Sequence, residues 1–261
     1  MRFLRSLLAG ACLLGACSVA VGDDLTNGLS FVAITPCRII DTRLLSGFSG
    51  DYGPPSLVAG SVRTFQITGT TTGTLTDCGI PDTAEALSAT FTVTGFSGPG
   101  DIRAFPAGGG ALPKSSVLNY QLENIANTTT VPMGPSGGGH NGIAVRADVH
   151  GTDLIVDVDG YYVTKVLAAF VNADGTLARG LHATGSVKLA TGQYQITFDR
   201  DLSLCFWIGS PGLSTFGGQF GNATISVAGR SVDTSSLFVE MDDTTTHAFK
   251  DNAFGLFVTC P

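Results

Sequence analysis

The chain has 261 residues, of which only 13% are charged, and its formal net charge is −7. Fourteen basic residues face 21 acidic ones and form no patch interleaved with aromatics, which argues against nucleic-acid binding because phosphate contacts need Lys and Arg. The 35 glycines and the many threonines favour short strands and tight turns over helices. The length allows one large domain or two ordinary ones.

Residues 1–16 are typical of an export signal. Arg2 and Arg5 precede an apolar stretch over residues 6–15, which is too short to span a membrane. No other apolar run approaches the ~20 residues that a spanning helix needs.

Two cleavage alternatives remain open. The sequence LGAC that ends at Cys17 resembles a bacterial lipobox, in which the cysteine becomes lipidated. Ordinary cleavage near Ala20 or Gly22 would instead release the chain. We therefore expect an exported protein that is either anchored in the cell envelope by a lipid at Cys17 or secreted.

After a polar tether over residues 17–30, period-two alternation predicts a first domain over residues 31–163. Its first strand is expected over residues 31–34 and is ended by Pro36. Later strands are expected over residues 62–67, 86–93, 117–122, 143–149 and 154–163. In the strand that begins at Ile143, the inward side chains would be those of Ile143, Val145, Ala147 and Val149.

A second domain is predicted over residues 164–261. Asp174-Gly175 between apolar runs is a hairpin signal. Strands are expected over residues 193–198, 204–208, 223–227, 237–241 and 254–258. Regular short strands without helical periodicity indicate an all-β fold, with two β-sandwich or jelly-roll-like domains in tandem.

Four cysteines remain outside the predicted signal and Cys17, and an exported chain meets an oxidising compartment. Four cysteines allow three pairings. We predict one disulfide in each domain, Cys37–Cys78 and Cys205–Cys260, because these pairs fall on opposite sides of the domain boundary. A zinc site is disfavoured, since no CxxC pair is present and the four histidines are scattered.

Residues 31–163 resemble an accessory domain found in many secreted bacterial proteins. The resemblance rests on TPCRIIDTR at residues 35–43, CGIP at 78–81, SVLNY at 116–120 and IVDVDGYY at 155–162. It implies an extracellular module with no established activity. The second domain resembles, more weakly, a C-terminal module of exported, fibre-like bacterial proteins, which implies surface display.

Arg38, Asp41 and Arg43 form the densest charged cluster. The arginines could recognise a carboxylate or a sugar, or the cluster could be a structural ion-pair network after the first strand. The network is the favoured interpretation, because Arg38 adjoins a disulfide cysteine. Asp157 and Asp159 resemble a calcium loop only faintly and are expected on one solvent face of a strand.

Catalytic constellations are weak. His140 lies in a glycine loop, but no G-x-S-x-G motif accompanies it. Trp207, the only tryptophan, is expected in a sandwich core beside Cys205 rather than on a sugar-binding surface.

We therefore expect a non-enzymatic structural, adhesion or surface-interaction protein without a cofactor or a metal. Its partner would be an extracellular protein or a glycan, and not a nucleic acid. We expect contact with a membrane only through a lipid on Cys17, and the sequence is compatible with an oligomer. Carbohydrate binding is the alternative function, and a cryptic hydrolase is a weaker one.

Overall fold

A computed structural model describes residues 28–69, 77–213 and 222–261. Those residues form seventeen β-strands and one short 3₁₀ helix, η1 (Gly50–Tyr52), and contain no α-helix. None of them makes a helix that is long and apolar enough to cross a membrane. The predicted signal, residues 1–16, and Cys17 lie outside the described residues. The predicted all-β tandem fold is confirmed.

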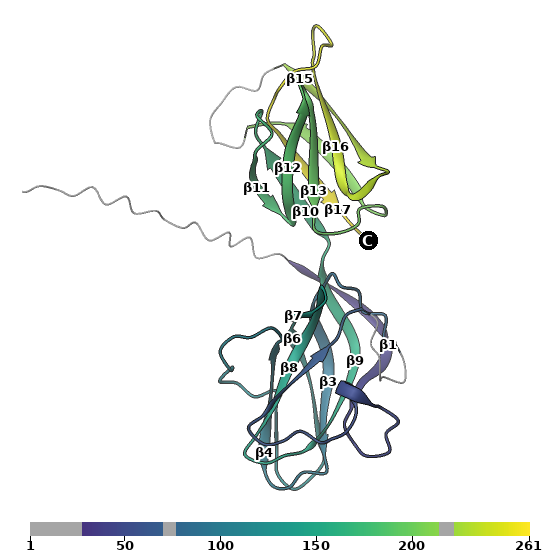
Figure 1. The fold of residues 1–261 in the computed structure, drawn as a ribbon, viewed down its shortest axis with the longest axis vertical. Helices are drawn as coiled ribbons and strands as arrows, with labels where there is room; N and C mark the ends of the chain where they lie inside the picture. Colours follow the sequence, from purple (N-terminus) through teal and green to yellow (C-terminus); the bar gives the residue numbers. More distant parts are fainter. Residues whose placement is uncertain (1–27, 70–76, 214–221) are drawn as a thin grey trace, which may run out of the picture.

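The strands of the N-terminal half form two antiparallel sheets, which we call the first module (Figure 1). One sheet has the order β1 (Leu29–Asp41), β9 (Asp153–Thr164), β3 (Ala84–Thr94) and β6 (Ile125–Pro132). The other has the order β2 (Val62–Gln66), β8 (His140–Asp148), β4 (Gly100–Pro106) and β5 (Leu118–Tyr120), and β7 (Gly134–Gly137) also pairs with β8. The first strand thus begins at Leu29, slightly before the expected residue 31.

Alternate side chains of these strands enter a core between the two sheets, as expected for a sandwich. In β3, Leu87, Ala89, Phe91 and Val93 are fully buried, and the polar residues between them, Ser88, Thr90 and Thr92, are half-buried. In β8, Ile143 and Val145 are fully buried on the facing sheet. The period-two pattern of each strand therefore supplies one apolar layer of the core.

Two local expectations for the first module were wrong. Val149 does not point inward but is 71% exposed, with a φ of 71°. Strand β8 ends at Asp148, and the N–H of His150 donates to the Asp148 carbonyl at 2.9 Å, so the chain turns at Val149.

Pro36 does not end the first strand, because β1 runs on to Asp41. Its pairing with β9 is interrupted after Ala33 and resumes at Cys37, and Pro36 lies in that irregular stretch. Strand β1 is also at the edge of its sheet. A bulge on an edge strand does not need the N–H that proline lacks, so proline is tolerated there.

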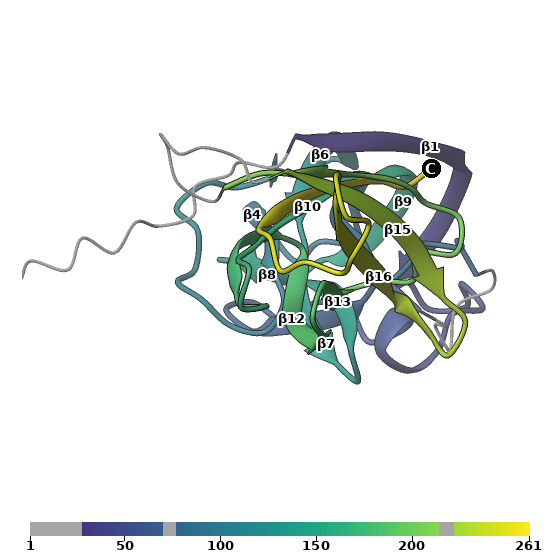
Figure 2. The same cartoon turned by 90° about the horizontal axis from the view of Figure 1, so that it is seen from above.

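The C-terminal half forms a second module with two further antiparallel sheets. One has the order β11 (Leu177–Leu181), β10 (Val166–Val171), β17 (Phe254–Thr259) and β14 (Phe206–Pro211). The other has the order β12 (Ala183–Ala190), β13 (Gln193–Phe198), β16 (Asp233–Asp243) and β15 (Ala223–Arg230). The view in Figure 2 looks down the second module onto the first.

The second module has its own core between these sheets. Tyr194 on β13 meets Phe254 on β17 edge-on, with ring centroids 5.1 Å apart. Trp207 is half-buried and packs against this core, as expected. The strand predicted over residues 204–208 is displaced to β14, because the N–H of Cys205 donates to the Leu202 carbonyl in a turn.

Each module contains one disulfide, with the pairing that the cysteine positions predict. Cys37 of β1 joins Cys78 across 41 residues, with Cα atoms 5.7 Å apart. Cys205 joins Cys260 across 55 residues, with Cα atoms 4.2 Å apart. The second disulfide therefore ties the end of β17 to the start of β14.

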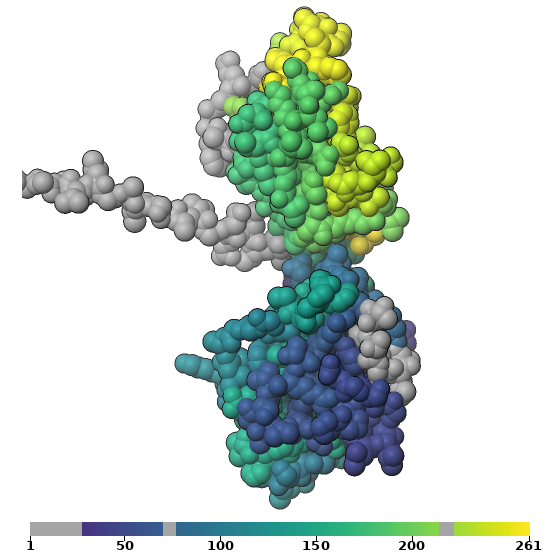
Figure 3. Space-filling view, viewed as in Figure 1, coloured from purple at the N-terminus to yellow at the C-terminus, as the bar shows by residue number. Residues whose placement is uncertain are grey.

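The two modules appear as separate bodies that meet at a narrow neck (Figure 3). The chain crosses at Thr164, whose N–H donates to Glu85 Oε1 of the first module at 3.2 Å. Arg200 Nη1 of the second module donates to the Thr164 carbonyl at 2.7 Å. His182 Nε2 lies 3.9 Å from Glu85 Oε1. The crossing backbone is thus held by side chains from both modules.

Removing the second disulfide should destabilise the second module selectively. Loop-closure entropy predicts a loss of about 4 kcal/mol at most for the Cys205→Ser, Cys260→Ser double variant. Trp207 reports on this module alone, so its fluorescence during chemical denaturation measures the effect. The Cys37→Ser, Cys78→Ser variant is the matched control and should leave the Trp207 transition in place. An equal shift in both variants would contradict the separation of the two cores.

Candidate functional site

The charged cluster predicted from the sequence is assembled by a bulge in β1. Residues three apart on a regular strand lie on opposite faces. An extra residue between Arg38 and Ile40 shifts the register against β9, and Ile39 and Ile40 are both buried. The bulge brings Asp41 back to the side of Arg38, while the direct cross-strand partner of Arg38 is Asp157.

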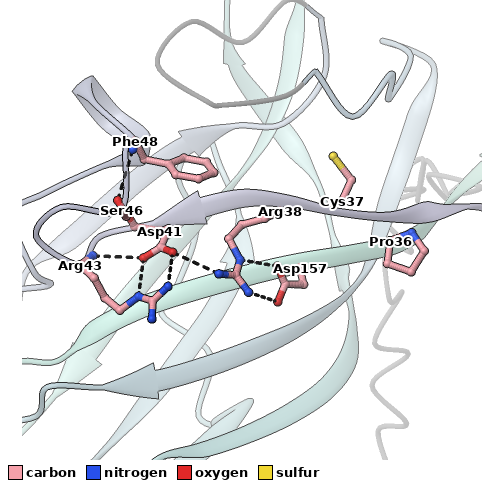
Figure 4. Close-up of a pocket in the computed structure, with 8 residues that line it drawn as sticks. All are labelled: Pro36, Cys37, Arg38, Asp41, Arg43, Ser46, Phe48 and Asp157. Atoms are coloured by element: carbon pink, nitrogen blue, oxygen red, sulfur yellow. Dashed lines mark hydrogen bonds and ion pairs between the residues drawn. The ribbon is translucent and has the colours of Figure 1, made fainter.

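Four side chains form one hydrogen-bonded network (Figure 4). Arg38 makes a fork to Asp157, with Nε to Oδ1 at 2.7 Å and Nη2 to Oδ2 at 2.9 Å. Arg43 makes a second fork to Asp41, with Nε to Oδ1 at 2.9 Å and Nη2 to Oδ2 at 2.7 Å. Arg38 Nη1 links the two pairs by donating to Asp41 Oδ2 at 3.3 Å.

Burial separates the roles of the four groups. The Asp41 side chain is 2% exposed, whereas Arg38 and Arg43 are 41% and 42% exposed. Burial by itself raises the pKa of Asp41, but the hydrogen bonds from Arg43 and the charges of both arginines outweigh it, so the pKa lies below 3.8. The hydrogen bond to Asp157 raises the pKa of Arg38, and the one to Asp41 raises that of Arg43.

The network lines an open pocket of about 500 Å³, and Pro36, Cys37, Ser46 and Phe48 complete its wall. The Ser46 hydroxyl donates to the Asp41 carbonyl at 2.9 Å and accepts the N–H of Phe48 at 3.2 Å, which holds the loop that follows β1. Two arginines and two aspartates give the site no net charge. The arrangement is therefore suited to bracing β1, β9 and this loop rather than to holding a free anion.

A second charged cluster, which is formed by ion pairs without hydrogen-bonded forks, was missed in the sequence. Asp148 of β8 lies 2.7 Å from Arg146 Nε and 2.7 Å from Arg103 Nε. Arg103 and Arg146 face each other directly across β4 and β8, so the shared carboxylate separates two like charges. The Arg-Ala-Asp spacing at residues 146–148 was the available signal, but the partner strand could not be known.

His140 is paired within the chain. Its Nδ1 lies 2.8 Å from Asp82 Oδ1. The Ser136 hydroxyl donates to the backbone carbonyl of His140 and not to its ring. Within residues 28–69, 77–213 and 222–261, no serine hydroxyl is hydrogen-bonded to the His140 ring. His140 therefore forms no Ser-His-Asp arrangement with the described residues.

Asp157 and Asp159, which the sequence places on one strand face, do not act as a pair. Both carboxylate oxygens of Asp157 accept hydrogen bonds from Arg38. The part of the chain that the structure describes contains no cluster of three His, Cys, Asp or Glu side chains placed to hold a metal ion.

An apolar surface on the second module was not predicted. We call it the outer face, which is the side of the β11-β10-β17-β14 sheet that is turned away from the core. Phe206, Ile208 and Phe257 on it are 75%, 67% and 48% exposed. The register places Ile208 beside Phe257, and Phe257 beside Ala168. The apolar side chains therefore form a continuous row across three strands.

No known protein family matches the chain, and a comparison with curated proteins finds none similar to it. The resemblance of residues 31–163 to a secreted accessory domain thus rests on its motifs alone and stays a prediction.

The network predicts that Asp41→Asn destabilises the first module. The change leaves both arginines without their shared carboxylate. Removing one partner of a fully buried pair costs roughly 3–5 kcal/mol, and the solvent exposure of the arginines reduces this to about 1–3 kcal/mol. Calorimetry should show the loss in the first module, while Trp207 fluorescence stays unchanged. Asp51→Asn, at an exposed carboxylate of the same module, should be neutral.

Asp41→Asn should also make the free energy of unfolding of the first module less dependent on pH under acidic conditions. The pKa of Asp41 is lower in the folded chain, so its contribution is present above pH 3.8 and is lost as pH falls through the folded value. Equal acid sensitivity of Asp41→Asn and the unmodified protein would show that Asp41 is not stabilised by the arginines.

Proposed function

We propose that the protein is an exported, non-enzymatic surface-interaction protein that binds its partner through the outer face. The observation that carries the proposal is the exposed row formed by Phe206, Ile208 and Phe257. Soluble monomers rarely leave contiguous apolar surface uncovered, and such patches mark interaction sites.

Export is supported by two features. The sequence of residues 1–16 has the charge and apolar pattern of a cleaved signal. The two disulfides fit an oxidising compartment outside the cytoplasm. Attachment through a lipid on Cys17 and free release remain the two forms of this proposal.

A non-enzymatic role is supported by the state of the polar clusters. Asp41 is neutralised by two arginines, Asp148 by two others, and the His140 ring is paired with Asp82. A catalytic acid or base usually has a pKa that its surroundings shift toward neutral pH. The pKa of Asp41 is instead lowered, and the carboxylates of Asp41 and Asp148 form ion pairs with arginines that connect neighbouring strands and loops.

Glycan binding is the second candidate. The exposed rings of Phe206 and Phe257 could stack on sugar rings. The outer face has few hydrogen-bonding side chains beside them, namely Ser210, Thr259 and Arg179, which favours a protein partner.

Substitution of the outer face should strongly weaken surface binding. Labelled protein is added to intact cells of the producing organism and bound protein is measured by flow cytometry. Ile208→Thr combined with Phe257→Ser should reduce binding about tenfold or more, because truncation of buried apolar anchors typically costs over 1 kcal/mol each. Val187→Thr combined with Leu189→Thr removes comparably exposed apolar side chains from β12 and should leave binding intact.

Equal binding by both double variants and the unmodified protein would refute the proposal. Binding to a broad glycan array that is lost in the outer-face variant would favour the second candidate.

The anchor has its own test. If Cys17 is lipidated, Cys17→Ala should abolish palmitate labelling and move the protein from the membrane fraction to the medium. Absence of label in the unmodified protein, together with its recovery from the medium, would instead show release.

A further inference from the structure

The outer face contains an apolar groove of about 510 Å³. Its floor consists of small residues, Ala168, Ser210 and Gly255, on three neighbouring strands. Ile208, Phe257 and Phe170 rise around this floor. A Cβ atom at Gly255 would lie 3.1 Å from the Phe170 ring, so the ring rests against the glycine. The groove therefore depends on a position without a side chain.

Arg179 stands at the rim of this groove. It is the cross-strand neighbour of Phe170, and its guanidinium carbon lies 4.5 Å from the centre of the Phe170 ring. The residue is exposed, and among the described residues no carboxylate lies within ion-pairing distance of it. The ring contact holds the planar guanidinium in place while its N–H donors remain available to a partner.

We propose that the groove binds a polypeptide segment that presents an apolar side chain next to a carboxylate, an inference that rests on the proposed function. The apolar side chain enters the space between Ile208, Phe257 and Phe170. The carboxylate then accepts hydrogen bonds from Arg179, whose fork matches carboxylate geometry. Charge complementarity therefore selects an acidic partner for this rim.

Other occupants fit less well. A second copy docked symmetrically through the same face would bring no carboxylate to Arg179. The outer face of the four strands is made of the following residues: Phe206, Ile208, Ser210, Gly255, Phe257, Thr259, Val166, Ala168, Phe170, Arg179 and Leu181. A fatty acid needs an enclosed cavity for its alkyl chain, whereas this groove opens along the sheet surface. A nucleic acid is disfavoured by the net charge of −7.

Blocked hexapeptides test the inference by NMR titration of the ¹⁵N-labelled protein. The probe is Ac-Gly-Ser-Phe-Glu-Ser-Gly-NH₂. The matched peptides replace its glutamate with glutamine or lysine, or its phenylalanine with alanine. We expect the probe to shift the amide signals of Arg179, Ile208 and Phe257. It should bind about threefold to fivefold more tightly than the glutamine peptide, which is the range of an exposed ion pair.

Protein variants separate the two contacts. Arg179→Gln should remove the preference for glutamate without changing the affinity for the glutamine peptide, and Arg179→Lys should retain part of the preference. Ile208→Thr should weaken both peptides. Arg230→Gln, on β15 of the other sheet, is the matched control and should change neither. An unperturbed spectrum of each free variant shows that the fold is retained.

Several results would overturn the inference. Equal affinity for the glutamate and glutamine peptides would refute the contact between the peptide carboxylate and Arg179. Signal shifts that Ile208→Thr leaves unchanged would refute binding in the groove. Signal shifts with decanoate but with no peptide would assign the groove to a lipid. Shifts that grow with protein concentration alone would assign it to a second copy. A third outcome is that no peptide binds, while the Ile208→Thr, Phe257→Ser variant still loses binding to cells. This outcome would refute the proposed ligand class but not the proposed function.

Discussion

Each sheet in this chain has one apolar face that has to be shielded from water, and this requirement determines how the sheets are arranged. The buried residues of β3 and β8 meet in one core, and those of β13 and β17 meet in another. Burial contributes roughly 25 cal/mol per Å² of apolar surface, so a four-stranded sheet gains most when a second sheet covers it. Two pairs of sheets thus give two cores, and the chain passes between them at Thr164.

The polar networks follow from this arrangement. When β1 bends at its bulge, Asp41 is carried to a position where only 2% of its side chain is exposed. An unpaired carboxylate there would be strongly unfavourable, so Arg38 and Arg43 are required as partners. The forks in turn connect β1 to Asp157 on β9. Stability of the loop after β1 therefore depends on a charge that the sheet geometry itself has buried.

Alternation along single strands is a local property, which explains how much of the fold was predictable. It correctly indicated strands around β3, β8 and β13, and the cysteine positions predicted both disulfides. Alternation was wrong at Val149, where a turn decides the backbone, and the expectation that proline ends the strand was wrong at Pro36, where β1 continues through a bulge.

Contacts between distant residues were beyond this kind of inference. The main partner of Arg38 is Asp157, which lies 119 residues away in the chain. The outer face was also missed, because Phe206, Trp207 and Ile208 are apolar in succession. Such a run does not show which face is turned outward; the facing sheet decides this by covering Trp207.

Charge density in the sequence is consequently a poor guide to a binding surface in this protein. Arg38 and Arg43 stand out beside Asp41, yet for that reason their charges are already neutralised. Arg179 lies between Ala178 and Gly180, so nothing in the sequence marks it as a binding residue. In the structure it is exposed and lies over the Phe170 ring, and no carboxylate of the described residues pairs with it. A guanidinium whose charge is not met within its own chain is available to a partner's carboxylate, and an apolar groove alongside it supplies the contact area that a single exposed ion pair lacks.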